Sequence, residues 1–435
     1  MASPLAVVKV RPRSRRRRRR VSRTVVLLGL TSLFTDMASE MVATTLPLYL
    51  VYAGGFSVLA YGFVDGIYNG AAALVSLASA FAADRGRSHK TVASAGYGMS
   101  ALCRLGLVLA GSSMPAIGAV VFLDRVGKGI RTAPRDAMIS LATTPQRLGA
   151  AFGVHRALDT TGAMLGPLAA FGLLAIAPLA FHSLFIISFC IALIGLGILV
   201  LLVEPPPADG SAAQCPALRK GLRCNRCTCA PELADGPPSL RDALALVRIP
   251  RYRALLIAGG TLSLATASDA FVFLALYDRV DLPVSVFPLL FVGVSAVFMV
   301  LAAPLGRLAD RAGRGRVLLA GYATLFAVYV LLLGPVGGWL LVAWALGLLG
   351  IYYAATDGVL MALGSAVVPE SVRGSGLALL RTATSGARLV AGIALGGLWT
   401  LWGSHGAFTV FAVALAAAGL VSARALSTAQ VSRHG

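Results

Sequence analysis

Charged residues are scarce in this sequence. They make up 13% of its 435 residues, whereas hydrophobic residues make up 57% and the mean hydropathy is +0.81. Soluble domains carry roughly 25% charged and 45–50% apolar residues. A soluble globular core is therefore excluded, and the composition is that of an integral membrane protein.

The sequence also lacks the short motifs of the common enzyme classes. It has no Walker A loop, no dinucleotide-binding fingerprint and no nucleophile elbow. Its five histidines, at positions 89, 155, 182, 405 and 434, are scattered. We expect no enzymatic activity and no cofactor, and the sequence gives no support to ATP-driven pumping.

Apolar stretches of about 20 residues, long enough to cross a bilayer, recur along nearly the whole chain. Backbone groups in hydrocarbon must be satisfied within their own segment, and these stretches are too long for barrel strands, so we expect helices. The predicted fold class is an all-α integral membrane protein with twelve transmembrane helices in two six-helix bundles. The predicted spans are 25–51, 58–82, 91–112, 115–140, 149–177, 182–203, 252–277, 286–305, 317–334, 338–364, 376–400 and 406–426.

The net charge of +20 is unevenly placed, since ten of the 38 basic residues lie in the first 23 positions. Basic joints at 84–90, 143–149, 204–250 and 306–316 alternate with joints poor in Lys and Arg. The positive-inside rule then places both termini in the cytoplasm and predicts a multi-pass protein of the cell membrane, plasma or inner. An Arg-rich nucleic-acid arm and a cleaved signal over residues 1–45 are the alternatives for the basic N-terminus, and we favour a topology determinant that touches anionic lipid.

A single long hydrophilic interval divides the spans six and six. We predict a basic cytoplasmic tail at 1–24, bundles at 25–203 and 251–426, a cytoplasmic linker at 204–250 and a tail at 427–435. The halves resemble each other at "AADRGRSHK" (82–90) and "LADRAGRGR" (308–316), and again at 145–167 and 369–392. Two repeated bundles are typical of transporters with a site between the repeats near the membrane midplane.

"GRLADRAGRGR" at 306–316 resembles the loop signature of the major facilitator superfamily. The matching residues are Gly306, Asp310, Arg311, Gly313, Arg314 and Arg316. The first-half copy keeps Asp84 and Arg85 but has Ala80 where the glycine belongs. The resemblance implies a gating role for these loops, in which the acid pairs with basic residues and a helix end on the cytoplasmic face. The alternative is a simple positive-inside stop signal, which does not require an Asp.

Two further motifs resemble the same superfamily. Arg125 in "LDRVGKGIRTAPRDA" resembles its membrane arginine. Gly162, Gly166 and Pro167 in "TGAMLGPLAAFG" resemble the motif of its antiporter-type exporters, although the trailing glycine pair is absent. Close helix packing explains these three residues equally well.

"LFTDMASEMVATTLPLYL" (33–50) places Asp36 and Glu40 on one helical face, one turn apart. Ionisable groups within a membrane usually face a bundle interior or a cavity. Burial and a neighbouring acid favour the protonated form of a carboxylate, so we interpret Asp36 and Glu40 as proton carriers. The full set predicted for the substrate and proton cavity is Asp36, Glu40, Asp65, Arg104, Arg125, Arg156, Asp159, Asp269, Asp357 and Arg388. Permanent ion pairing, as between Arg156 and Asp159, is the alternative for some of them.

Four of the six cysteines, Cys215, Cys224, Cys227 and Cys229, lie in the predicted linker. Their spacing is a weak zinc signal because no second C-x-x-C follows. We predict no metal site and keep Cys224, Cys227 and Cys229 as weak candidates only.

Together these patterns favour a secondary transporter that works by alternating access and exports a small organic compound in exchange for protons. A proton-coupled importer of a nutrient, siderophore or metal ion is the first alternative, and a non-transporting membrane sensor or scaffold is another. The predicted partners are a small-molecule substrate, protons and membrane lipid, without nucleic acid, and the predicted oligomeric state is a monomer.

Overall fold

The computed structural model of the protein describes residues 22–85, 89–144, 147–204, 246–368 and 373–431. Within these ranges, the side chains of 72–85, 373–375 and 427–431 are not described. The Arg-rich N-terminal run, most of the predicted linker with its four cysteines, and the side chains of Asp84 and Arg85 therefore lie outside the described part.

The described residues contain helices and no strand. The first half comprises α1 (Arg23–Ala43), α2 (Leu46–Leu48), η1 (Tyr49–Ala53), α3 (Val58–Arg85), α4 (His89–Ala110), α5 (Met114–Leu141), α6 (Leu148–Ile176), α7 (Phe181–Gly197) and η3 (Ile198–Leu202). The second half comprises η5 (Leu246–Arg248), α9 (Pro250–Leu264), α10 (Asp269–Val280), η6 (Val284–Val286), α11 (Phe287–Ala312), α12 (Arg314–Leu333), α13 (Gly338–Thr356), α14 (Val359–Val367) and α15 (Arg373–Val431).

Each predicted span coincides with a helix or with consecutive helical segments. Nine stretches of the described chain are long and apolar enough to cross a membrane. The last of these, Gly376–Leu426, contains two predicted spans and bends at Gly403, whose positive φ of 70° breaks the helical path. The predicted spans 58–82 and 115–140 correspond to α3 and α5. The predicted fold class is confirmed, and twelve helical passages are consistent with it.

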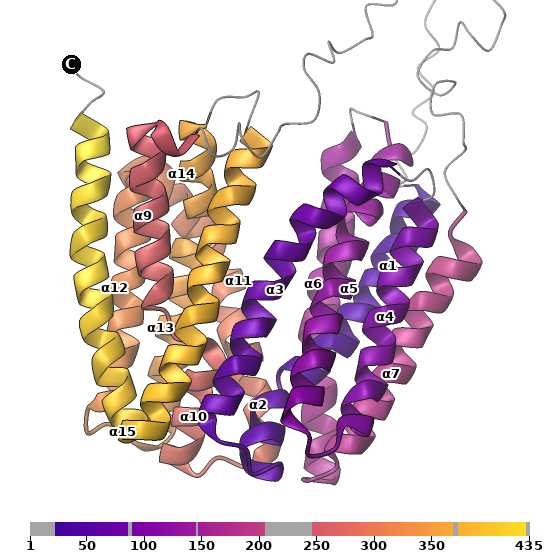
Figure 1. The fold of residues 1–435 in the computed structure, drawn as a ribbon, viewed down its shortest axis with the longest axis horizontal. Coiled ribbons are helices and arrows are strands. Elements are labelled where there is room, and N and C mark those ends of the chain that lie inside the picture. Colours follow the sequence, from indigo (N-terminus) through magenta and orange to yellow (C-terminus); the bar gives the residue numbers. More distant parts are fainter. Residues whose placement is uncertain (1–21, 86–88, 145–146, 205–245, 369–372, 432–435) are drawn as a thin grey trace, which may run out of the picture.

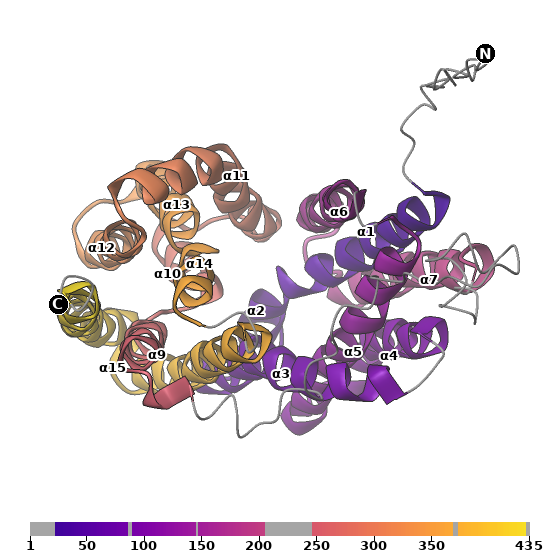
Figure 2. The ribbon, with the colours of Figure 1, turned by 90° about the horizontal axis from the view of Figure 1, so that it is seen from above.

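The two halves lie side by side, as the side view and the view from above both show (Figures 1 and 2). We call one end of the molecule the linker end. The end of η3, the start of α9 and the connection between α11 and α12 lie there. The opposite end holds residues 54–57, 111–113 and 281–283. The halves touch where α3 runs along α15 and where α6 meets α11. In Figure 1 the ribbons of the two halves converge at the opposite end and diverge toward the linker end.

The glycines of α3 and α15 bring these two backbones into direct contact. A Cβ atom added at Gly62 would lie 2.6 Å from the carbonyl oxygen of Gly392, and one added at Gly66 would lie 2.8 Å from that of Leu389. A Cβ at Gly396 would lie 2.7 Å from the carbonyl oxygen of Val58. The association of the halves at the opposite end therefore depends on small residues, as is common between helices in membranes.

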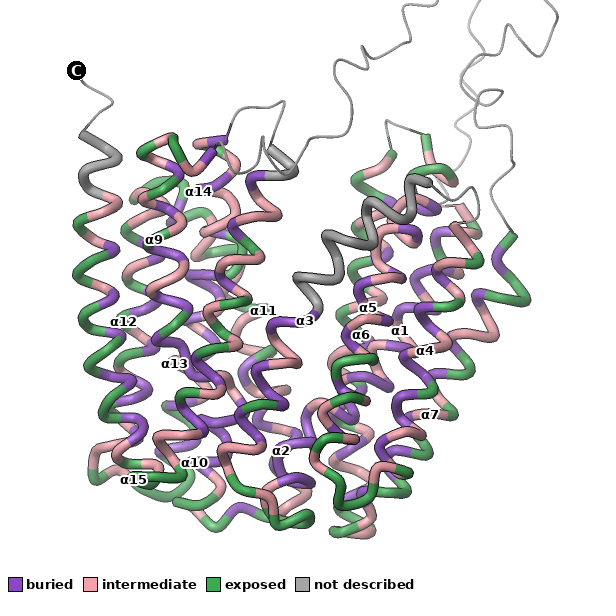
Figure 3. Tube along the Cα trace, in the orientation of Figure 1, coloured by how far each residue is buried: buried purple, intermediate pink, exposed green. Residues whose placement is uncertain are grey.

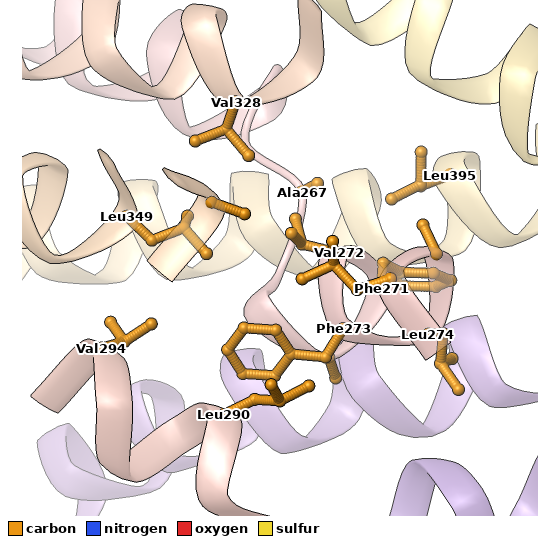
Figure 4. Packing of buried hydrophobic residues seen from close by; sticks show 14 of the residues in the cluster. Ala267, Phe271, Val272, Phe273, Leu274, Leu290, Val294, Val328, Leu349 and Leu395 are labelled. Carbon is orange, nitrogen blue, oxygen red and sulfur yellow. The ribbon is translucent and has the colours of Figure 1, made fainter. Parts of the chain in front are cut away.

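The core of the second half surrounds α10 (Figure 4). All seven side chains of the stretch "AFVFLAL" (270–276) are buried, so this helix is enclosed on every side. Phe273 makes an edge-to-face contact with Phe291 at 4.6 Å between ring centroids. The outer surface is different: exposed stretches alternate with buried ones along α7 and α15 (Figure 3), and Leu193, Ile194 and Leu201 are exposed apolar residues suited to lipid.

Candidate functional site

A cavity of about 310 Å³ lies between the two halves. Its lining comes from α1, α2 and α3 of the first half. In the second half it comes from the segment joining α9 to α10, from the start of α10, and from α11, α13 and α15. The charged residues of the lining are Glu40, Asp65, Asp269 and Arg388, and its aromatic residues are Tyr61, Tyr68, Phe291 and Tyr353. Four of the residues predicted from sequence are thus brought together here.

A break between α9 and α10 forms one wall of the cavity. Thr266, Ala267 and Ser268 are non-helical and line the cavity. The hydroxyl of Tyr329 on α12 accepts the N–H of Ala267 at 2.7 Å and donates to the carbonyl of Ala265 at 3.2 Å. Irregular backbone at membrane depth is tolerated where it is satisfied by protein or lines a cavity, and Tyr329 supplies that satisfaction.

The cavity carboxylates differ in their partners. Asp269 begins α10, where the helix N-terminus favours negative charge, and it accepts the hydroxyl of Tyr353 at 2.8 Å. Asp65 is 7% exposed and accepts the hydroxyl of Tyr61 at 3.3 Å. Glu40 makes no ion pair within 4.0 Å with any residue that the structure describes.

A network of charges fills the interior of the first half beside this cavity. Asp36 on α1 pairs with Arg131 on α5 at 3.4 Å. Asp159 on α6 lies 4.0 Å from Arg135, also on α5. The acids of α1 and α6 thus meet a row of cations on α5, in the manner expected of paired charges within a membrane.

A second group of charges in the network lies nearer the N-terminal end of α5. Asp124 pairs with its neighbour Arg125 and lies 3.9 Å from Arg104 on α4. Arg104 also donates to the Ser39 hydroxyl on α1 at 2.6 Å. The guanidinium of Arg125 sits 3.9 Å from the ring centroid of Tyr68, which lines the cavity. A cation–π contact therefore links this group to the cavity wall.

Two predicted cavity residues lie elsewhere. The side chain of Arg156 is 81% exposed and meets only the edge of the network, at 3.9 Å from Asp159. Asp357 is exposed at the end of α13 and is not part of the cavity lining. Counting residues along a helix gives the depth of a side chain but not the direction in which it points. For this reason the sequence could not show that Arg156 and Asp357 point away from the cavity.

The cations of α5 beyond Arg125 were not singled out from the sequence. Lys128, Arg131 and Arg135 follow Asp124 at intervals of four, three and four residues, which place all four on one helical face. Phe122 and Leu123 are exposed on another. The sequence pattern that predicts this arrangement is charged residues repeated every three or four positions along an otherwise apolar helix.

The second-half loop motif forms an ion pair within its own half. Arg314 at the start of α12 donates to Asp310 near the end of α11 at 2.9 and 3.1 Å, and to the carbonyl of Ala362 on α14 at 3.2 Å. Gly313 between the two helices has φ of +101°, a conformation that L side chains rarely adopt. A Cβ atom at Gly306 would meet nothing within 4 Å. The motif therefore joins three helices at the linker end.

The glycines of α6 lie against α1. A Cβ atom added at Gly166 would lie 2.5 Å from the carbonyl oxygen of Met37, and one added at Gly162 would collide with the backbone of Leu33. Pro167 follows inside the same helix. Close packing of α6 on the segment that carries Asp36 and Glu40 is thus a direct consequence of these glycines.

Two hydrogen bonds between described residues join the halves at the opposite end. The hydroxyl of Tyr52 donates to the carboxylate of Asp278, and its ring lies 4.8 Å from that of Tyr277. The N–H of Leu59 donates to the hydroxyl of Thr400 at 3.1 Å. These contacts therefore hold the two halves together at the opposite end.

This arrangement of two helical halves around one cavity agrees with the comparison with known families. The family model of the Major Facilitator Superfamily matches residues 28–302. The chain belongs to the Major Facilitator Superfamily. It is a membrane transporter of this type. Among the described residues there is no cluster of three or more His, Cys, Asp or Glu side chains able to hold a metal ion.

Relatives of this superfamily protein cover most of its length. An uncharacterized MFS-type transporter of Methanocaldococcus jannaschii is 29% identical over 397 residues, which cover 88% of this chain and 90% of that protein. The crystal structure of a mutant of the nucleoside transporter NupG covers 92% of this chain and 99% of its own, with a TM-score of 0.75 and 15% identity. A mutant of the peptide transporter POT covers 94% of each chain, with a TM-score of 0.71 and 14% identity. At such identities these two structures show the shared superfamily fold alone.

Proposed function

We propose that this protein is a secondary active transporter that exchanges a small organic solute for protons across the cell membrane by alternating access. The observation that carries the proposal is the cavity between the halves, in which Glu40, Asp65 and Asp269 gather at membrane depth. Ionisable groups are costly there and are typical of solute and ion pathways. A scaffold that moves nothing has no use for such a cavity.

The distribution of cations supports a cytoplasmic linker end. Lys90, Arg147, Arg248, Arg311 and Arg314 lie at that end, whereas Arg279 lies at the opposite end. This asymmetry follows the positive-inside rule. Both termini are then cytoplasmic, the protein is multi-pass, and the conformation described above faces the cytoplasm.

In the proposed cycle Glu40 and Asp36 carry the proton. Glu40 faces the cavity, and Asp36 one turn away is held by Arg131. A proton that arrives from outside can occupy a carboxylate of the cavity, and its transfer inward disturbs the ion pairs along α5. The proposed proton route therefore begins at Glu40 in the solute cavity and continues through the ion pairs along α5.

The loop that contains Asp310 and Arg314 is proposed to stabilise the second half at the cytoplasmic face, with Asp84 and Arg85 as its counterpart in the first half. The ion pair of 2.9 Å and the bond to Ala362 hold α11, α12 and α14 in one arrangement. The protein is proposed to act as a monomer without cofactor.

The test is a proton-flux measurement in proteoliposomes of the full chain. Internal pH is followed under an imposed proton gradient while organic solutes and metal ions are added one at a time. We expect a particular solute to trigger proton movement in the antiport direction. The matched variants are Glu40→Gln, which should abolish gradient-driven flux, and Asp281→Asn on the exposed turn after α10, which should leave it unchanged.

Proton movement of the opposite sign would identify a symporter and overturn the exchange. Silence across a broad panel, with correctly folded protein, would favour the sensor alternative. Unchanged flux in both Glu40→Gln and Asp36→Asn would remove these two residues from the proton route.

A further inference from the structure

We infer that the cavity selects a singly charged organic cation with an apolar or aromatic body. The inference rests on the proposed transport function and names the substrate class of the same site. The features that carry it are the charge balance of the lining, the aromatic walls, and Glu40, which forms no ion pair within 4.0 Å with a described residue.

The lining holds three carboxylates and a single arginine. Arg388 and the N-terminus of α10 both offset the charge of Asp269, so this acid has compensation from within the second half. Asp65 is surrounded by neutral polar groups, namely the hydroxyl of Tyr61, Asn69 on α3 and Ser268 of the second half. A hydroxyl donor satisfies a lone pair of a carboxylate but leaves its charge in place.

Glu40 is the carboxylate with room for a partner. It lines the cavity, and no ion pair with a described residue reaches it within 4.0 Å. Lys128 on α5 interacts electrostatically with both Glu40 and Asp36. Even when Lys128 is counted together with Arg388, the three carboxylates of the lining outnumber these two cations by one. A single positive charge on the solute balances this excess.

The walls suit the body of such a cation. Tyr61, Tyr68, Phe291 and Tyr353 line the cavity with aromatic surface, and cations are attracted to the faces of such rings. Tyr68 already makes this contact with the guanidinium of Arg125 at 3.9 Å. The volume of about 310 Å³ lies at the lower end of the range of small-molecule pockets, so the solute is small.

Anionic solutes fit this lining poorly. A carboxylate or phosphate that reaches Arg388 would also enter the field of Asp269, Asp65 and Glu40, and like charges in a low-dielectric site repel strongly. A cation bound at Glu40 instead displaces a proton from the same group. Competition of solute and proton for one carboxylate is the simplest physical basis for exchange.

The test uses permanently charged probes, whose charge does not change with pH. Thermal stabilisation of the purified full chain is measured with phenyltrimethylammonium, benzyltrimethylammonium and tetraethylammonium, and with benzoate, phenylacetate and benzyl alcohol as anionic and neutral counterparts. We expect saturable stabilisation by the ammonium probes and none by the others. In Glu40→Gln and in Asp65→Asn the apparent affinity for the ammonium probes should fall about ten- to a hundredfold, the loss expected for a bond to a charged group. Asp281→Asn is the control that should keep it.

The cation inference is overturned by stabilisation with the anionic or neutral probes alone, by no stabilisation with any ammonium probe, or by ammonium binding that both variants leave unchanged. Two carboxylates on different helices are tested so that misfolding of one variant does not decide the outcome. The proton-flux assay separates this inference from the transport function. Flux with a neutral or anionic solute would support the proposed transport function and contradict the cation inference. Ammonium binding without flux for any solute would support the cation site and contradict the transport function.

Discussion

Asp36 on α1 and Arg131 on α5 form an ion pair of 3.4 Å inside the first half, with side-chain exposures of 15% and 3%. The guanidinium of Arg131 also lies 4.5 Å from the ring centroid of Tyr97 on α4. One cation thus ties together three helices. Asp36 lies one helical turn from Glu40. The ion pair with Arg131 therefore fixes the part of α1 that carries both proposed proton carriers to α5.

Removal of one partner of this pair should destabilise the fold. Asp36→Asn leaves Arg131 buried without its counter-charge, and we expect a loss of about 3 kcal/mol in the free energy of unfolding. The double variant Asp36→Asn/Arg131→Gln should recover most of it, because position 131 then no longer carries a buried charge without its partner. Thermal unfolding in detergent measures both. Asp310→Asn serves as the control, since its side chain is 65% exposed and its pair should contribute at most about 1 kcal/mol. Equal losses in Asp36→Asn and Asp310→Asn would contradict the prediction.

The hydrogen bond from Tyr52 to Asp278 should hold the opposite end closed. Tyr52→Phe keeps the ring contact with Tyr277 but loses a bond to a charged group, which contributes about 1.5 kcal/mol or more. We expect labelling of a Leu59→Cys background by a membrane-impermeant thiol reagent to become about tenfold faster. Tyr49→Phe is the matched control because the Tyr49 hydroxyl contacts Gly111 within the first half. An unchanged labelling rate in Tyr52→Phe would show that the bond has no part in closure.

Gly62→Ala should prevent the contact between α3 and α15. Its Cβ would lie 2.6 Å from the carbonyl oxygen of Gly392, and a backbone carbonyl cannot move aside as a flexible side chain can. We expect loss of solute-driven proton flux and increased access to the cavity from the opposite end. Gly118→Ala on α5 is the control because a Cβ there meets nothing within 4 Å. Wild-type flux in Gly62→Ala would mean that the halves do not need this approach.

Arg314→Gln should alter transport far more than stability. Both members of its pair with Asp310 are substantially exposed, at 40% and 65%, so we expect a change below about 1 kcal/mol in unfolding. Loss of the bond to Ala362 frees α14 at the linker end, and the rate of flux should fall several-fold. Measurement of unfolding and flux on the same preparation separates the two effects. A large drop in unfolding temperature would assign the pair a purely structural role.

Much of the fold could be predicted from the sequence because the length of an apolar stretch is set by the thickness of the membrane. The predicted span 286–305 and helix α11, or 182–203 and the segment from α7 to η3, differ by only a few residues at most ends. Even the bend at Gly403 falls between two predicted spans. The break at Thr266–Ser268 was not predicted, because the span 252–277 reads as one continuous apolar run.

The cavity could be predicted only in part. Depth along a helix predicted Glu40, Asp65 and Asp269 for the cavity, since each lies within a predicted span, and all three line it. Depth gave no rotation about the helix axis, so it also included Arg156 and Asp357. The inward-facing cations Lys128, Arg131 and Arg135 belong to no motif of the superfamily, so only the spacing of all the charges along α5 predicts their direction.

Helix α10 carries Asp269 at its first residue and Asp278 near its last, and it is 12 residues long. At ~1.5 Å per residue the two carboxylates are separated by about 14 Å along one rigid rod. Asp269 meets the solute cavity, and Asp278 holds Tyr52 of the other half. The non-helical residues before Asp269 separate α10 from α9. We therefore expect a tilt of α10 to move Asp269 and Asp278 together. One short rigid helix therefore connects the solute cavity to the hydrogen bond that joins the halves at the opposite end.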